Sequence, residues 1–195
     1  MKIDFFSTTL NSSITKKLSK LFKKKFISSG SVSDQFEKNF SKLFGLKYCT
    51  AVNSGTSALH LSLRCGKVGF GDEVIIPAQT FIATGLAVKY VGAKPVFADI
   101  QKNTGNICPK SILKKISKKT KAIIVVHWGG YPCDMFEIRK IAKKNNLILI
   151  EDAAHALGAN YNKFAIGNIS DFTCFSFQAK KQLTTGDGGM LICKR

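Results

Sequence analysis

The chain has 195 residues, of which 45% are hydrophobic, and its formal net charge is +18. That length is sufficient for one well-buried domain. We expect no transmembrane helix, because no apolar run reaches the roughly 18 residues that a span requires. Residues 1–7 lack the apolar core of a signal peptide, so none is expected.

The first 45 residues are predicted to form two amphipathic helices separated by a loop at residues 28–31. Their apolar faces consist of Ile14, Leu18, Leu21 and Phe22 in the first helix and of Phe36, Phe40, Leu43 and Phe44 in the second. We assign residues 1–29 to an N-terminal helical segment and residues 30–195 to the main domain.

After residue 45, short apolar strands alternate with helices. The predicted strands are 48–52, 73–76, 94–98, 122–127, 147–151, 172–175 and 189–193. The predicted helices are 56–64, 81–91, 110–118 and 134–145. This alternation predicts an α/β three-layer sandwich with a mostly parallel, seven-stranded sheet covered on both faces.

The positive charge comes mainly from lysines in three clusters, at residues 16–25, 110–121 and 143–144. Each cluster lies in a segment with helical apolar spacing, so we interpret the lysines as solvated helix faces. A basic nucleic-acid-binding protein is the alternative interpretation, but specific recognition would also need a reading helix or aromatic residues interleaved with the basic ones. A positive field also attracts anionic substrates.

Six cysteines are scattered along the chain without a C-x-x-C pair. Several lie in apolar, strand-like runs, so we expect free thiols in a reducing cytoplasm. Their spacing is too wide for a zinc site, and no metal is expected.

Polar side chains collect after the predicted strands, where ligands bind in parallel sheets. The segment 53–59 follows a strand and opens a helix, so its backbone N–H groups and the hydroxyls of Thr56 and Ser57 suit a phosphate. An ordinary strand-to-helix turn with a serine or threonine N-cap explains the same pattern. Phe81 could stack on a flat ring, although aromatic residues more often pack in a core.

Asp152 ends an apolar strand, and Lys180 and Lys181 follow the next one. A buried carboxylate is costly unless it is paired, and a cationic pyridinium is a suitable partner. A pyridoxal phosphate enzyme needs a lysine that forms a Schiff base and an aspartate that keeps the pyridine nitrogen protonated. His155 either contacts such a ring or fills space, and the pattern does not choose between the two lysines.

Taken together, these residues resemble the DegT-type family of pyridoxal-phosphate-dependent nucleotide-sugar aminotransferases. The resemblance covers about residues 28–195. The motifs that carry it are Gly30 with Gln35-Phe36-Glu37, then 53–59, 71–84, Val126-His127, 131–135, 151–155 and 176–189.

The resemblance implies fold type I, with residues 30–195 as the cofactor-binding large domain and the C-terminal small domain absent, since family members run roughly twice as long. It selects Lys181 as the Schiff-base lysine and implies Asp152 on the pyridine nitrogen. It implies five further contacts with the cofactor, by Phe81 on the ring, His155 near the phenolic oxygen, and Thr56, Ser57 and Ser176 at the phosphate.

The expected activity is the transfer of an amino group, with glutamate as donor, to a keto group of a nucleotide-linked sugar. Such reactions serve the biosynthesis of cell-surface polysaccharides or deoxyamino sugars. Relatives form dimers that share active sites, so a homodimer is expected. A truncated, catalytically inactive fragment of such an enzyme is the alternative.

Overall fold

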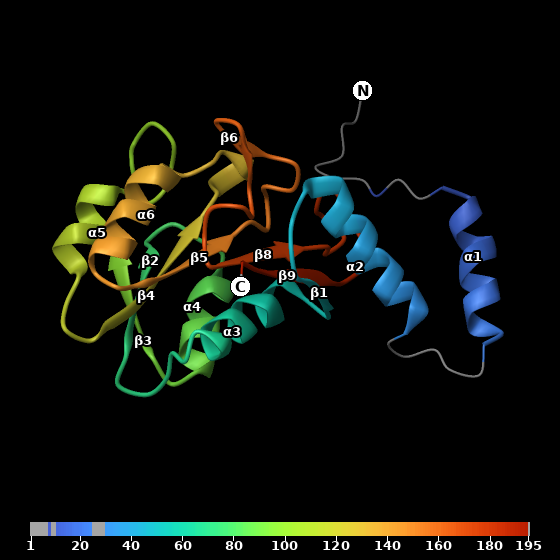
Figure 1. Cartoon of the computed structure of the whole chain (residues 1–195), viewed down its shortest axis with the longest axis horizontal. Coiled ribbons are helices and arrows are strands. Elements are labelled where there is room, and N and C mark those ends of the chain that lie inside the picture. The colour runs from blue at the N-terminus through green and yellow to red at the C-terminus, as the bar shows by residue number, and fades with distance from the viewer. Residues whose placement is uncertain (1–7, 9–10, 25–29, 195) are drawn as a thin grey trace, which may run out of the picture.

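A mixed seven-stranded sheet forms the centre of the molecule (Figure 1). The computed structural model describes residues 8, 11–24 and 30–194. The strand order is β1-β9-β8-β5-β4-β2-β3, and only β9 runs antiparallel to its neighbours. The strands are β1 (Cys49–Val52), β2 (Glu73–Pro77), β3 (Lys94–Ala98), β4 (Thr120–Val126), β5 (Ile148–Asp152), β8 (Phe172–Ser176) and β9 (Gly189–Cys193). The predicted fold class is therefore confirmed.

Helices cover both faces of the sheet because the buried strands are apolar on both sides. The helices are α3 (Gly55–Cys65), α4 (Ile82–Tyr90), α5 (Pro109–Lys115) and α6 (Met135–Lys144). One core cluster unites α3 and α4 with side chains such as Ile124 and Ile150, and another unites α5 and α6 with Ile123 and Leu149. Side chains alternate between the faces along each strand, so consecutive residues of β5 belong to different cores.

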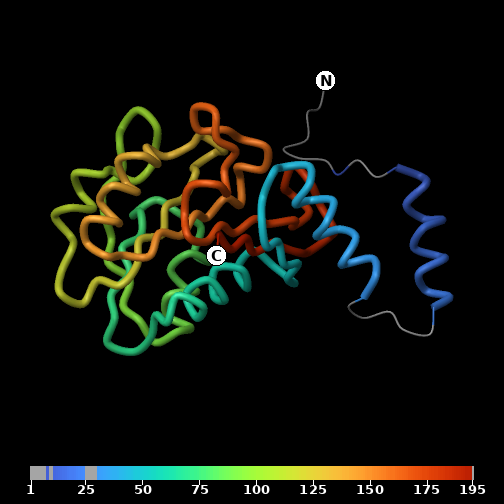
Figure 2. The backbone as a smooth tube through the Cα atoms, in the orientation of Figure 1, coloured from blue at the N-terminus to red at the C-terminus, as the bar shows by residue number. Residues whose placement is uncertain are grey.

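Helix α2 (Ser31–Phe44) lies beside the last strands of the chain, although it is far from them in sequence (Figure 2). Phe40 is 3% exposed and makes edge-on ring contacts with Phe175 and Phe177. Leu43 was expected on this apolar face, but it is 76% exposed. Its neighbour Phe44 packs against the core instead.

Helix α1 (Ser13–Phe22) stands apart from the sheet (Figure 1) and contributes no buried residue. The described lysines of all three basic clusters are exposed, as expected of solvated faces. Of the predicted loop at 28–31, the first two positions lie outside the described residues, whereas Gly30 caps α2 and Ser31 already begins that helix. In the described part of the chain, no helix has both the length and the apolar character needed to cross a membrane.

The sequence pattern missed two small elements. A hairpin of β6 (Asn160–Tyr161) and β7 (Phe164–Ala165) follows β5, and a short 3-10 turn η1 (Trp128–Gly130) follows β4. Both are too short to show a hydrophobic period. The cysteines are all free, but only Cys133 and Cys174 are buried.

Candidate active site

A pocket of about 630 Å³ opens where β4, β5 and β8 end and α3 and α4 begin. Six of the seven predicted site residues line it, namely Thr56, Phe81, Asp152, His155, Ser176 and Lys181. Ser57 is the exception and does not line the pocket. Its hydroxyl lies 2.9 Å from the hydroxyl of Ser54, which does line it. Residues more than a hundred positions apart thus meet in one cavity.

The N-terminus of α3 forms one wall of the pocket. Ser54 caps the helix, since its hydroxyl accepts a hydrogen bond from the backbone N–H of Ser57 at 3.0 Å. Gly189 packs against this turn so tightly that a Cβ there would lie 2.5 Å from the Ser54 carbonyl carbon. The glycine-rich segment after Lys181 can therefore approach the helix start only with glycine at this position.

Asp152 lies at the end of β5 with 6% of its surface exposed. Its Oδ2 accepts a hydrogen bond from the Thr84 hydroxyl at 2.8 Å, and its Oδ1 accepts one from the Ala154 N–H at 3.2 Å. Burial raises the pKa of Asp152, and these two hydrogen bonds only partly oppose that effect. A cation in the pocket would favour the ionised carboxylate.

Lys181 and His155 share the pocket with Asp152. Burial lowers the pKa of Lys181, and the charge of Asp152 opposes the shift. Burial, followed by the nearby positive charge of Lys181, lowers the pKa of His155. An amine with a lowered pKa is more readily available as a nucleophile. The side-chain amide of Gln182 ties the lysine segment to the His155 carbonyl at 2.5 Å.

Two aromatic side chains flank the opening. Phe81 precedes α4 and is 70% exposed, so it is not packed in the core as phenylalanine usually is. Trp128 also lines the pocket, and its ring meets the His155 ring edge-on at 5.9 Å. The Oδ1 of the buried Asn106 accepts a hydrogen bond from the backbone N–H of Trp128 at 2.9 Å, which fixes that part of the wall.

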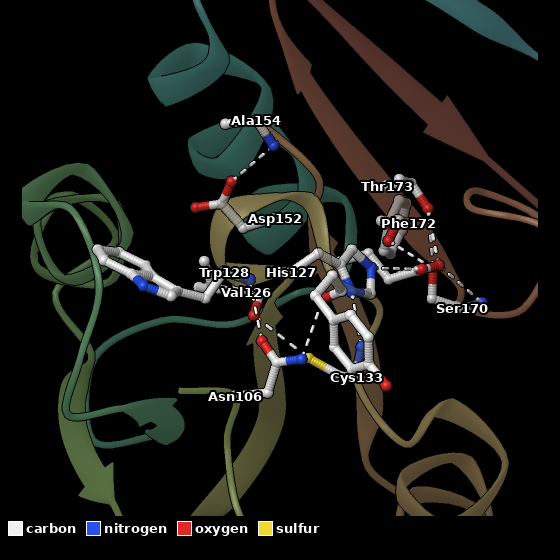
Figure 3. A network of polar contacts seen from close by, with 12 residues as sticks. Asn106, Val126, His127, Trp128, Cys133, Asp152, Ala154, Ser170, Phe172 and Thr173 are labelled. Atoms are coloured by element: carbon white, nitrogen blue, oxygen red, sulfur yellow. Dashed lines mark hydrogen bonds and ion pairs between the residues drawn. The ribbon is translucent and has the colours of Figure 1, made fainter. Parts of the chain in front are cut away.

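His127 follows β4, but its side chain is fully buried and does not line the pocket. Its Nε2 contacts the Glu151 carboxylate at 2.9 Å, and its Nδ1 accepts the Cys133 N–H at 3.1 Å. Ser170 and Thr173 donate to the other oxygen of Glu151. Figure 3 shows this cluster separate from the contact between Asp152 and Ala154.

Thr84, Trp128 and the Glu151 cluster were not predicted as site residues from the sequence. Thr84 lies in an apolar helical segment and follows the expected Phe81 by three positions. One helical turn brings such a residue toward the same side, which is the signal that could have revealed it.

The lining residues suit pyridoxal phosphate. The pocket combines a buried carboxylate for a cationic ring nitrogen, an amine for an aldehyde, an exposed aromatic ring, and a helix start with hydroxyl groups for a phosphate. In the described part of the chain, no cluster of three or more histidine, cysteine or acidic side chains could hold a metal ion.

Comparisons with known proteins agree with this chemistry. The chain is 46% identical over 166 residues to the spore coat polysaccharide biosynthesis protein SpsC of Bacillus subtilis (strain 168), which covers 85% of this chain and 43% of that protein. It is 44% identical over 165 residues to GDP-perosamine synthase of Escherichia coli O157:H7, covering 85% of this chain and 45% of the synthase.

Among solved structures, the putative sugar aminotransferase Spr1654 of Streptococcus pneumoniae in its PMP form matches with a TM-score of 0.96 and 32% identity. The match covers all of this chain and 53% of that one. A PLP form of the same protein matches equally well, so the expected cofactor agrees with these neighbours. The chain spans about half the length of the relatives it matches.

The description "DegT/DnrJ/EryC1/StrS aminotransferase family" belongs to a family model that matches residues 8–194. That range includes the helices α1 to α6 and every strand of the sheet. The chain therefore belongs to the DegT/DnrJ/EryC1/StrS family of sugar aminotransferases.

Proposed function

We propose that this chain is the cofactor-binding part of a pyridoxal-phosphate-dependent aminotransferase. The enzyme transfers an amino group from glutamate to a keto group of a nucleotide-linked sugar, for cell-surface polysaccharide or deoxyamino sugar biosynthesis. The observation that carries this proposal is the meeting of Asp152 and Lys181 in one pocket with a helix start and Phe81.

Three hydroxyl residues are proposed to hold the phosphate. Thr56 and Ser176 line the pocket at the start of α3 and at the end of β8. Ser57 acts through Ser54, to which its hydroxyl is hydrogen bonded. The free N–H groups of the helix start add favourable dipoles for an anion.

The reacting part of the site lies between Asp152 and Lys181. When bound, pyridoxal phosphate supplies a ring that withdraws electrons from a substrate carbon. Asp152 would hold a proton on the ring nitrogen, and His155 would contact the phenolic oxygen. Phe81 would stack on the ring, since its side chain is largely exposed in this structure. Lys181 would hold the cofactor through its Nζ, and the same amine, whose pKa is lowered by burial, would serve as the base that moves a proton between Cα and C4′.

The substrate class is proposed from the relatives. One relative is named GDP-perosamine synthase, and another is named dTDP-3-amino-3,6-dideoxy-alpha-D-galactopyranose transaminase. Both names denote nucleotide-linked amino sugars. The net charge of +18 supports this assignment, since a positive field attracts a sugar diphosphate.

We propose a homodimer located in the cytoplasm. An apolar stripe of Ile82, Leu86 and Tyr90 runs along α4, and these side chains are 65%, 36% and 58% exposed. The stripe continues to Phe81 at the pocket, so a second copy packed on α4 would adjoin the site. Free thiols fit the reducing cytoplasm.

We further propose that residues 30–195 fold as the large domain, with residues 1–29 as a helical segment outside it. The 195-residue chain alone is proposed to give negligible turnover, because relatives have about twice its length. In such relatives the remaining half would contribute to binding of the sugar nucleotide.

The test is glutamate-dependent amination of a 4-keto or 3-keto nucleotide sugar, measured with and without a co-expressed C-terminal half from a relative. Product is expected only when both parts are present. Robust turnover by the lone chain would contradict the proposed need for the second half. Absence of both turnover and cofactor binding in every combination would contradict the proposed activity itself.

A further inference from the structure

Two threonine hydroxyls lead from the pocket wall to Asp152. Thr84, in α4, is fully buried, and its Oγ1 donates to Asp152 Oδ2 at 2.8 Å. The Oγ1 of Thr80, a pocket-lining residue, lies 2.7 Å from that of Thr84. The three side chains form a continuous chain of hydrogen bonds between α4 and the end of β5.

The ionised carboxylate of Asp152 decides which group donates and which accepts in each of these hydrogen bonds. An ionised carboxylate has no proton to donate, and a hydroxyl has only one. Since Thr84 donates its proton to Asp152, the contact between the two hydroxyls is left with Thr80 as donor and Thr84 as acceptor. Hydrogen bonds in such a series polarise one another, so Thr80 strengthens the bond that Thr84 makes.

We propose that Thr84, supported by Thr80, is a positioning residue that keeps Asp152 ionised and oriented for the ring nitrogen of the cofactor. The inference rests on the proposed function, because the role of Asp152 belongs to it. Among the hydrogen bonds of the described residues, Thr84 is the only side chain that donates to this carboxylate, and the Ala154 N–H donates to the other oxygen.

An ordinary structural role for Thr84 does not account for these contacts. Threonine in a helix commonly bonds to a carbonyl of the preceding turn. Here the Thr84 backbone N–H already bonds to the Phe81 carbonyl, while its hydroxyl is used between two side chains. The hydroxyl therefore serves the carboxylate rather than the helix.

The hydrogen-bonded series Thr80–Thr84–Asp152, here called the threonine relay, counteracts the effect of burial on the Asp152 carboxyl. Burial favours the neutral acid, whereas its proposed task needs the anion. A hydroxyl donor favours the anion without adding a second charge to the pocket. It also fixes Oδ2, so the side chain keeps one orientation before any ligand arrives.

The first test follows the titration of Asp152 in the cofactor-free chain, by NMR of ¹³C-carboxyl-labelled aspartate, with Asp152→Asn used to assign the signal. The other titratable groups that act on Asp152 are His155, His127, Lys181 and Cys174, and none is changed. Thr84→Val should raise the pKa of Asp152 by about one unit, since a hydrogen bond to a charged group is lost. Thr84→Ser, which keeps the hydroxyl, should restore the wild-type value.

The matched control is Thr120→Val, which removes another buried threonine hydroxyl at the far end of β4. It should leave the Asp152 titration unchanged. Thr80→Val should give a smaller shift in the same direction as Thr84→Val. If Thr84→Val does not fold, Thr80→Val decides, and an unchanged titration in that variant overturns the relay.

The second test is fluorescence titration with pyridoxal phosphate. Thr84→Val should weaken binding about tenfold or more, and Thr84→Ser should bind almost as well as the wild type. A shifted Asp152 titration without any binding by the wild type would support the relay and contradict the proposed function. An unshifted titration in a folded Thr84→Val protein overturns the relay whatever the cofactor does.

Discussion

The two adjacent carboxylates at the end of β5 are both buried, yet they lie in opposite surroundings. Glu151 faces the α5 and α6 side, where His127, Ser170 and Thr173 all donate to it. Asp152 faces the α3 and α4 side, where one hydroxyl and one backbone N–H donate to it and the pocket begins. One cluster is closed, and the other is open to a ligand.

This difference appears in the direction of the pKa shifts. Burial alone raises the pKa of Glu151, but hydrogen bonds from His127, Ser170 and Thr173 outweigh burial and lower it. The pKa of Asp152 stays raised, because its donors do not outweigh burial. A closed cluster holds a strand end in place, whereas an incompletely paired carboxylate is available for a cationic partner.

The largest effect is expected for Asp152→Asn in the reaction. The amide cannot hold a proton on the ring nitrogen, so conversion of bound pyridoxal phosphate by glutamate should slow by roughly a thousandfold, or on the order of 4 kcal/mol. Single-turnover absorbance measurements on a preparation competent for this half-reaction give the rate. Near-normal rates would mean that another residue has the role assigned to Asp152.

The next largest effect is expected for Glu151→Gln on stability. Because the Cys133 N–H fixes the His127 tautomer, the new amide NH₂ would face the Nε2–H of His127 or the hydroxyls opposite. We expect a loss of about 3 kcal/mol in the free energy of unfolding, measured by urea denaturation at neutral pH. Glu137→Gln, on the exposed side of α6, should change little.

The pH dependence of that loss has a defined sign. The folded pKa of Glu151 is lowered, so its stabilisation is present above the ordinary glutamate value of 4.5 and disappears as the pH falls through the folded value. The difference between the wild type and Glu151→Gln should therefore shrink in acid. A constant difference from neutral to acidic pH would contradict the closed cluster.

A smaller effect of opposite sign is expected for Asp152→Asn in the cofactor-free chain. The folded pKa of Asp152 is raised, so its contribution to stability is present below the ordinary value of 3.8 and is lost as the pH rises through the folded value. At neutral pH the buried anion costs stability, and Asn removes that cost. We expect a gain of about 1 kcal/mol in the free energy of unfolding, measured by urea denaturation. A clear loss would mean that the Asp152 carboxylate, like that of Glu151, is fully paired in the folded chain.

The smallest effect is expected at α1, which buries no residue. Leu18→Ser should change the free energy of unfolding by less than about 0.5 kcal/mol, as at other surface positions. Phe40→Ala in α2 provides the contrast, with an expected loss of about 3 kcal/mol or more from a buried ring. An equal loss in both variants would show that α1 packs against the core.

The sheet and most site residues could be predicted because their signals are local. Strands such as β5 are continuous apolar runs, and Asp152 is the polar residue that ends one of them. The choice of Lys181 over Lys180 came from the resemblance alone. In the structure both line the pocket, so geometry does not separate them either.

The Glu151 cluster and the threonine relay could not be predicted from local pattern. Ser170 and Glu151 lie nineteen positions apart, and Thr84 and Asp152 lie sixty-eight apart. Their contacts depend on the crossover order of β4, β5 and β8, which brings these strands together. Leu43 shows the converse, since the helical period placed it on the apolar face of α2 but its side chain is 76% exposed in the folded chain.

The attachment site of the cofactor tests the central claim most directly. The chain is incubated with pyridoxal phosphate, reduced with borohydride, digested and mapped by mass spectrometry. The account predicts a near-visible absorption band that disappears on reduction, and a pyridoxyl group on Lys181 that Lys181→Ala abolishes. A pyridoxyl group on Lys180, or none on the segment that follows β8, would contradict it.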